Sequence, residues 1–383
     1  MSVTAPAGFR AAGVTAGLKP SGRPDVALVV NDGPQDSLAA VFTSNRCKAA
    51  PVLWSEVVAR GGRGRAVVLN SGGANCYTGP EGFATTHGTA EHVAGLLGVG
   101  AGEVVVCSTG IIGEQLDRPR LLAGVDAAAA ALGADGGHDA AVAVMTTDTR
   151  PKEAVAAGDG WTAGGLAKGA GMLAPALATM LVVLTTDAVV TPADADAALR
   201  RATALTFDRL DSDGCQSTND TVVLLASGAS GVTADADALA AVLTPLCDDL
   251  ATQLLGDAEG SEHDVSITVR GAASEADALE VGRAVARSNL LKTAIFGRDP
   301  NWGRVMAAVG TTSAAFDPAV LDVSFNGVAV CRDGGVGEPR HLVDLTARAV
   351  TIDVDLKEGQ AQATVRTNDL THAYVHENSA YTT

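Results

Sequence analysis

The sequence predicts a mixed fold, α/β or α+β, in which β-sheets are stacked and helices lie outside them. Strand and helix patterns alternate along all 383 residues, a length that suits two or three domains. Hydrophobic residues make up 47% of the chain but aromatic residues only 3%, so we expect a core of Ala, Val and Leu. This apolar content excludes a mainly disordered chain, because such chains cannot build a core.

Two short apolar runs in the first third of the chain predict buried strands. Residues 65–70 (RAVVLN) and 103–107 (EVVVC) are rich in valine, and each run enters a turn that contains glycine. The alanine-rich residues 126–132 predict a helix.

The middle of the chain predicts a central strand followed by a helix. Residues 179–190 (TMLVVLTTDAVV) form a β-branched apolar run, which is typical of a strand buried on both faces. Thr191 and Pro192 supply an N-cap and a first-turn proline for a helix that runs to about Leu210.

Another strand and a long helix follow. Residues 221–226 (TVVLLA) predict a buried strand. Residues 234–255 predict a helix with one apolar face, formed by Leu239, Val242, Leu243 and Leu246.

The last third predicts a smaller αβ region that begins at about residue 263. Residues 265–269 alternate like a strand, and residues 275–289 have the pattern of an amphipathic helix. Asn326 and Gly327 are typical of a two-residue turn that joins two strands within residues 320–330.

A second hairpin is expected near the C-terminus. Its strands would be residues 350–356 and 361–365, joined across the four residues 357–360.

Charge and motif patterns exclude several classes of protein. A formal net charge of −17 argues against nucleic acid and anionic membranes as partners. The apolar runs are far shorter than the about 20 residues of a spanning helix, and residues 1–10 lack the apolar core of a signal peptide. We therefore expect a cytoplasmic protein. The six cysteines form no CxxC pair and the histidines no HExxH or HxH pattern, so no metal site is expected.

The segment that carries the chemistry is residues 168–185 (KGAGMLAPALATMLVVLT). By local composition it is a glycine-rich turn that leads into a core strand, with Thr179 as an ordinary strand residue. A second interpretation is a self-processing site cut between Ala178 and Thr179. Thr179 would then carry its own general base, because an α-amine has a pKa near 8 and is partly neutral at physiological pH.

Seven motifs make the second interpretation specific, because together they resemble the ornithine acetyltransferase (glutamate N-acetyltransferase, ArgJ) family over most of the chain. In chain order they are NSGGANCYTG (70–79), STGIIG (108–113), MTTDT (145–149), KGAGMLAPALATM (168–180), DGCQSTND (213–220), KTAIFG with DPNWGR (292–304) and ENSAYTT (377–383).

The resemblance implies a precursor that cleaves itself into an alpha chain, residues 1–178, and a beta chain, residues 179–383. It also implies stacked β-sheets flanked by helices and a heterotetramer of two alpha and two beta chains. The implied reaction moves acetyl from N2-acetylornithine to glutamate through an acetyl-enzyme. Bifunctional members also take acetyl from acetyl-CoA, which makes acetyl-CoA a candidate co-substrate; no other cofactor is implied.

Site residues follow from the motifs. Thr179 is the nucleophile, and Thr109 with Gly110 matches the family's oxyanion hole, in which a hydroxyl and a backbone N–H receive the negative oxygen. Substrate-contacting positions that match the family are Thr146, Lys168, Thr179, Glu259, Asn378 and Thr383.

Two of these residues bring the charges that a small zwitterion needs. Lys168 is a candidate for the substrate carboxylate, and Glu259 for either the ornithine ammonium or the Thr179 amine. Each is otherwise a solvated loop side chain, and Thr109-Gly110 is otherwise a plain turn after a strand.

Two other functions remain open on the sequence. An N-terminal-nucleophile amidohydrolase or aminopeptidase uses the same chemistry with water as the acyl acceptor. An acidic binding protein would instead keep Thr179 buried and uncut.

Overall fold

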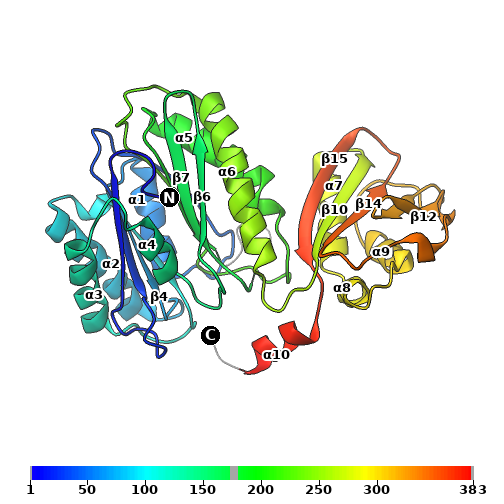
Figure 1. The fold of residues 1–383 in the computed structure, drawn as a ribbon, viewed down its shortest axis with the longest axis horizontal. Helices are drawn as coiled ribbons and strands as arrows, with labels where there is room; N and C mark the ends of the chain where they lie inside the picture. Colours follow the sequence, from blue (N-terminus) through cyan, green and yellow to red (C-terminus); the bar gives the residue numbers. More distant parts are fainter. Residues whose placement is uncertain (1, 173–179, 381–383) are drawn as a thin grey trace.

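Three β-sheets and the helices that cover them form the protein in a computed structural model, which describes residues 2–172 and 180–380. Two sheets are packed against each other, and the third, formed by the last third of the chain, lies to one side (Figure 1). The prediction of stacked sheets flanked by helices is confirmed.

The first sheet has four strands in the order β1-β2-β4-β5. Their bounds are β1 (Phe9–Val14), β2 (Val26–Asn31), β4 (Ala66–Ser71) and β5 (Val104–Thr109). The two strands predicted in this region are β4 and β5, and they run parallel, with Ser71 opposite Thr109. Their carboxyl ends therefore meet at one edge of the sheet.

The second sheet has five strands in the order β3-β9-β8-β7-β6. Their bounds are β3 (Ser37–Phe42), β6 (Lys152–Ala157), β7 (Thr162–Lys168), β8 (Leu181–Thr186) and β9 (Thr221–Ala226). The apolar run after residue 179 is central, as predicted, but the strand ends at Thr186, earlier than expected. β9 has the predicted bounds.

The two sheets share one core of small apolar side chains. Val29 and Val67 from the first sheet belong to the same buried cluster as Val183 and Val223 from the second. Most side chains of this cluster are valine, alanine and leucine, and Phe9 is its buried aromatic residue, which agrees with the low aromatic content of the sequence.

Helices cover both outer faces, giving four layers (Figure 1). The first sheet is covered by α2 (Gly79–Leu97) and α3 (Arg118–Ala130), and the second by α5 (Pro192–Leu205) and α6 (Ala236–Gly256). The sandwich also contains α1 (Ala50–Arg60) beside β5 and α4 (Gly137–Ala143) beside β1.

The capping residues mark where the helices begin, whereas the apolar pattern is a poorer guide to where they end. The Thr191 side chain caps α5 as predicted by accepting the Asp194 N–H at 3.1 Å, but α5 ends at Leu205 and not near Leu210. α3 begins at Arg118, well before the predicted residue 126, because the Asp117 side chain caps it.

α6 is the predicted long helix. Among the described residues, it is the one helix long and apolar enough to cross a membrane, and half of its apolar window is buried inside the protein. Leu239, Leu243 and Leu246 face the core as predicted, which is the pattern of a core helix.

The third sheet has six strands in the order β13-β12-β11-β14-β10-β15. They are β10 (Asp264–Ala272), β11 (Asp322–Phe325), β12 (Val328–Arg332), β13 (Gly335–Val336), β14 (Ala349–Asp355) and β15 (Ala361–Asn368). The predicted turn at Asn326 and Gly327 is confirmed, and both residues have the positive φ that such a turn requires.

The helix expected over residues 275–289 is confirmed as α7 (Glu275–Ala286), which ends three residues earlier than predicted. The Ser288 side chain then caps a second helix, α8 (Asn289–Phe296). α9 (Trp302–Val309) follows them.

The second predicted hairpin does not exist, because β10 lies between β14 and β15 and pairs with both. The connecting residues cross the end of β10, where the N–H groups of Glu358 and Gly359 donate to the Gly271 carbonyl at 2.7 and 2.8 Å. β14 and β15 are therefore separated by β10, a strand from earlier in the chain, and do not pair with each other.

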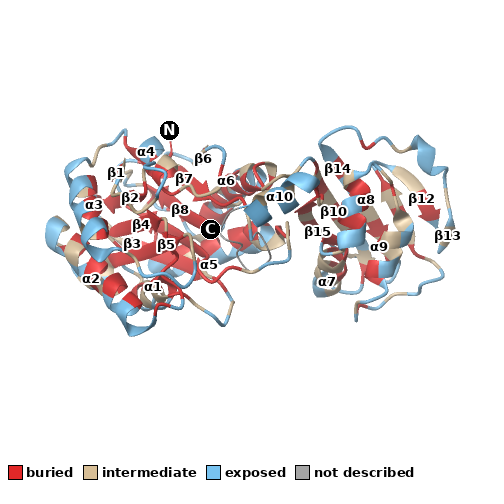
Figure 2. Cartoon of the chain, turned by 90° about the horizontal axis from the view of Figure 1, so that it is seen from below, coloured by how far each residue is buried: buried red, intermediate tan, exposed pale blue. Residues whose placement is uncertain are grey.

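After β15 the chain turns back toward the sandwich, and α10 (His372–Ala380) lies beneath the loop that follows α6 (Figure 1). The Thr371 hydroxyl donates to the Gly260 carbonyl at 2.6 Å and fixes the start of this return. Seen from below, the sandwich strands are buried whereas α10 is mainly exposed (Figure 2). The C-terminal helix is therefore an added layer over the end of the sandwich.

Candidate active site

A cavity of about 240 Å³ at the ends of the sandwich strands collects the predicted site residues that the structure describes. Its walls include Thr109, Gly110, Thr146, Lys168, Glu259 and Asn378. These residues come from the ends of β5 and β7, the loop after α4, the loop after α6, and α10. Ala178, Thr179 and Thr383 lie outside the described residues.

The end of β5 presents backbone to the cavity. Gly110 has a φ of +127°, and a Cβ atom there would lie 2.5 Å from the Gly73 nitrogen, so no other residue fits without displacement. The N–H groups of Gly72 and Gly73 both donate to the Thr109 carbonyl at 3.0 Å. The glycine turn after β4 thus holds the Thr109-Gly110 backbone in place.

Lys168 lies at the end of β7, is 1% exposed, and donates from Nζ to Thr109 Oγ1 at 3.0 Å. An ammonium can donate hydrogen bonds but cannot accept them. The Thr109 hydroxyl oxygen is therefore the acceptor in this contact, and the hydroxyl hydrogen points elsewhere. Donation by a cation also makes that hydroxyl a stronger donor. Burial lowers the pKa of Lys168, while the nearby carboxylate of Asp148 opposes this effect.

Asp148 connects the segments that carry Thr146 and Lys168. Its carboxylate accepts the N–H of Thr146 at 2.9 Å, the N–H of Gly169 at 2.7 Å and the Lys152 ammonium at 2.6 Å. Burial would raise its pKa, but the charges of Lys168 and Lys152 outweigh burial and bring the pKa down to about 2. Asp148 is therefore ionised in the folded protein at neutral pH.

A buried ion network extends from Asp148 to the loop after α6. The Lys152 ammonium also donates to Asp257 Oδ2 at 2.6 Å, and the Thr149 N–H donates to the same oxygen at 3.1 Å. No motif in the sequence marks Lys152 or Asp257 as a functional residue. Asp148 lies in the MTTDT motif, whose three threonines and one aspartate are the available sequence signal.

Glu259 stands in that loop with both carboxylate oxygens occupied. The Thr147 hydroxyl donates to Oε1 at 2.7 Å, and the Asn378 amide donates to Oε2 at 3.0 Å. The second contact brings the C-terminal helix over the cavity, as the resemblance implied. A Cβ atom on Gly171 would lie 2.6 Å from the Glu259 carboxyl group, so any other residue there would displace this carboxylate.

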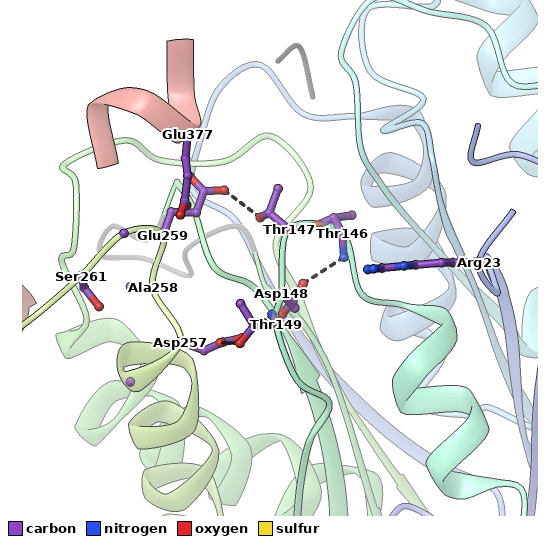
Figure 3. Close-up of a pocket in the computed structure, with 12 residues that line it drawn as sticks. Arg23, Thr146, Thr147, Asp148, Thr149, Asp257, Ala258, Glu259, Ser261 and Glu377 are labelled. Atoms are coloured by element: carbon purple, nitrogen blue, oxygen red, sulfur yellow. Dashed lines mark hydrogen bonds between the residues drawn. The ribbon is translucent and has the colours of Figure 1, made fainter. Parts of the chain in front are cut away.

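A larger, open cavity of about 770 Å³ shares Thr146, Thr147 and Glu259 with the first one. Glu377 lies beside Glu259 on one side of it, and Arg23 lies on the opposite side, next to Thr146 (Figure 3). The outer cavity therefore adjoins the inner one through two threonines and a carboxylate, and its own walls add charged side chains of both signs.

The loop before β9 contributes Ser217, Thr218 and Asn219 to the cavity wall. The next residue, Asp220, is fully buried and accepts the Met180 N–H at 3.1 Å through Oδ1. Asp220 is the last residue of the DGCQSTND motif, which by itself predicts no role for this carboxylate. Within residues 2–172 and 180–380, no group of three or more His, Cys, Asp or Glu side chains is placed to hold a metal ion.

The chain is similar along its whole length to curated proteins of one family. The chain is 62% identical over 381 residues to the arginine biosynthesis bifunctional protein ArgJ of Streptomyces coelicolor, and the match covers both proteins completely. It is also 62% identical over 383 residues to the protein of the same name from Thermobifida fusca, again with complete coverage of both.

A solved structure, ornithine acetyltransferase complexed with ornithine from Mycobacterium tuberculosis, is 52% identical. That match covers 47% of this chain and 96% of the other, with a TM-score of 0.43. The family model of the ArgJ family matches residues 10–383. The chain belongs to the ArgJ family.

Proposed function

We propose that the protein is a glutamate N-acetyltransferase of arginine biosynthesis. It moves the acetyl group of N2-acetyl-L-ornithine to L-glutamate and so yields L-ornithine and N-acetyl-L-glutamate. Complete-length identity of 62% to ArgJ proteins supports this reaction. The observation that carries the proposal is the single cavity lined by all six described residues that the family motifs had assigned to the site.

The proposed nucleophile is Thr179, freed by self-cleavage after Ala178. Its α-amine takes the proton from Oγ while Oγ bonds to the acetyl carbon. The resulting ammonium gives the proton to the nitrogen of ornithine as the carbon–nitrogen bond breaks. Glutamate then enters, and its amine takes the acetyl group from the enzyme by the reverse steps.

The oxyanion of each tetrahedral intermediate is assigned to Thr109 and Gly110. Both line the cavity, and the Lys168 ammonium already occupies the acceptor side of the Thr109 hydroxyl. The hydroxyl hydrogen is then free for the developing negative oxygen, together with the Gly110 N–H. Lys168 thereby adds positive charge behind the hole.

Substrate contacts are assigned to Thr146, Lys168, Glu259, Asn378 and Thr383. Thr146, Lys168, Glu259 and Asn378 line the cavity and supply a cation, an anion and neutral hydrogen-bonding groups, as an amino acid with a charged side chain requires. Glu259 is held by Thr147 and Asn378 and needs no rearrangement to meet an ammonium.

Acetyl-CoA is proposed as a second acetyl donor, since both ArgJ relatives are named bifunctional. The open outer cavity beside the acetyl site offers room for a donor larger than acetylornithine. We further propose a cytoplasmic heterotetramer of two alpha and two beta chains without a metal. All six cysteines are free thiols, which suits a reducing compartment.

The test combines mass spectrometry with an acetyl-transfer assay. The purified protein should consist of two fragments, one ending at Ala178 and one starting at Thr179. It should transfer [¹⁴C]acetyl to glutamate from acetylornithine and, in a parallel assay, from acetyl-CoA. Thr179→Ala should abolish both cleavage and transfer.

An intact 38.3 kDa chain that is fully active would overturn the mechanism. Release of acetate at the same rate with and without glutamate would show a hydrolase instead.

A further inference from the structure

Asp220, just before β9, has a buried carboxylate oxygen that accepts no hydrogen bond from the described part of the chain. The residue is 0% exposed, and Oδ1 accepts the Met180 N–H at 3.1 Å. Oδ2 is the unpaired oxygen, since no residue within 2–172 or 180–380 donates a hydrogen bond to it. Leaving a carboxylate oxygen unpaired inside a protein is costly, so a partner that arrives later is the natural explanation.

The position of Asp220 shows which group could be that partner. β8 and β9 run parallel with Leu181 opposite Thr221, so Asp220 precedes β9 as Met180 precedes β8. The α-nitrogen of residue 179 is three bonds from the Met180 nitrogen, and three such bonds span at most about 4 Å. A carboxylate anchored on the Met180 amide is therefore within reach of the amine that cleavage would create.

Three other elements place polar groups near the same carboxylate. The Lys168 ammonium approaches from β7, the Thr43 hydroxyl from the end of β3, and the Ser217 hydroxyl from the loop before β9. Burial nevertheless raises the pKa of Asp220 well above its usual range, because these groups and the Met180 amide do not compensate for the loss of water. The uncut chain thus holds an acid that a neighbouring amine would ionise.

We propose that Asp220 is the positioning residue for the amino terminus that self-cleavage creates at residue 179, with Oδ2 accepting a hydrogen bond from that amine. This inference rests on the proposed function, because the amine exists only in a cut chain. Asp220 itself neither gains nor loses a proton during turnover. It stabilises the ammonium that forms when the amine takes the hydroxyl proton and later returns it to the leaving nitrogen.

A pH signature separates this role from a structural one. A carboxylate beside an amine raises the pKa of that amine, since the opposite charge favours the protonated form. In Asp220→Asn the amine would lose its proton at lower pH. The acid limb of the kcat/KM profile for acetylornithine should then move down by about one pH unit, while kcat at the optimum should fall at least about tenfold.

The matched control is Asp187→Asn. Asp187 is also buried, but it follows the other end of β8 and accepts N–H groups of Ala7 and Thr162 at 3.0 and 2.7 Å. This control should be cut normally and keep the acid limb of the unchanged protein. If Asp220→Asn gives the same acid limb and kcat as the control, Asp220 has no such role.

Two further readouts keep the outcomes distinct. Mass spectrometry of each protein reports cleavage; if the unchanged protein is intact and active, the proposed function fails, whatever Asp220 does. If Asp220→Asn does not fold or is not cut, a crystal structure of the mature unchanged protein decides. An amine nitrogen within about 3.2 Å of Oδ2 supports the proposal, and one beyond about 4 Å overturns it.

Discussion

The contact between Lys168 and Thr109 shows how two residues chosen separately from motifs act as a unit. Lys168 was expected to meet a substrate carboxylate, yet Nζ already lies 3.0 Å from Thr109 Oγ1. An ammonium can donate in three directions, so one contact leaves the predicted role intact. The pairing instead explains why a threonine hydroxyl suits an oxyanion hole: its acceptor side is occupied and its hydrogen is available.

Removing the Thr109 hydroxyl should affect the chemical step more than binding. We expect Thr109→Ala to lower kcat by a factor on the order of 10² to 10³ with a small change in KM, because the donor matters mainly in the transition state. Thr109→Ser keeps the hydroxyl and should retain most of the activity. Steady-state acetyl transfer measures both, and equal losses in the two variants would contradict the role.

Asp148 should make the free energy of unfolding depend on pH in the acidic range. Its pKa is lowered to about 2 in the folded protein against about 3.9 in an unfolded chain. The ionised form therefore contributes stability that is fully present above about pH 5 and is lost as the pH falls toward 2, an amount of about 2–3 kcal/mol. Urea unfolding of Asp148→Asn and its parent should show a difference that shrinks by this amount over that range.

The parent for that comparison should carry Thr179→Ala, so that both proteins remain single chains. A stability difference that is constant between pH 5 and pH 2 would show that the Asp148 charge is not responsible.

At the scale of elements, the position of α10 depends on a close contact between the backbone of Gly260 and the backbone of Tyr374. Gly260 has a φ of +61°, and a Cβ atom there would lie 2.2 Å from the Tyr374 nitrogen. Because α10 carries Asn378, and Asn378 binds Glu259, the helix and the loop after α6 form one wall of the cavity. The loop glycine sets the distance between them.

Gly260→Ala should push α10 away and weaken substrate binding. We expect the KM for acetylornithine to rise about tenfold, equivalent to about 1.4 kcal/mol, and amide hydrogen exchange in α10 to accelerate. Gly98→Ala is the matched control, since Gly98 has a similar φ of +69° but nothing within 4 Å of the added Cβ. An equal rise in KM in both variants would point to general strain in place of the α10 contact.

Short sequence patterns predicted individual helices, strands and turns well, but they predicted less well which strands pair with each other. The Asn326-Gly327 turn was predictable because two adjacent residues determine it. The hairpin expected across residues 357–360 was wrong because β10, almost 80 positions earlier, occupies the space between its strands. The site was likewise predictable at the level of single residues, because the family resemblance identified Thr109, Lys168 and Glu259.

Burial and pairing between distant segments were not predictable. Lys152 and Asp257 each read as ordinary charged residues, and only the fold brings them together inside the protein at 2.6 Å. The free oxygen of Asp220 is a property of packing that no pattern in the sequence encodes.

At the scale of the whole molecule, the proposed cut falls within a sheet that both halves share. β3, β6 and β7 precede residue 178, whereas β8 and β9 follow residue 179, and in the sheet β9 and β8 lie between β3 on one side and β7 with β6 on the other. β8 pairs with β7 along its whole length, and β9 pairs with β3. Separating the halves would therefore break the central sheet and expose the core between the layers.

The two fragments should consequently behave as one particle. We expect them to co-elute in native size-exclusion chromatography at any dilution that leaves the protein folded, and to separate only in denaturant. Thr179→Ala, which stays uncut, gives the reference elution volume. Dissociation of the fragments on dilution alone would contradict the shared sheet.

The shared sheet also means that the mature protein could not refold in the way in which the precursor first folded. In the proposed precursor, a single chain would fold at a rate independent of protein concentration. If the proposed cut occurs, a mature molecule that unfolds would become two separate chains that must associate again by diffusion, because no covalent link joins them. Lifetime in the cell would then depend on how slowly the mature particle first opens, and its one-to-one stoichiometry would be inherited from a single translation product.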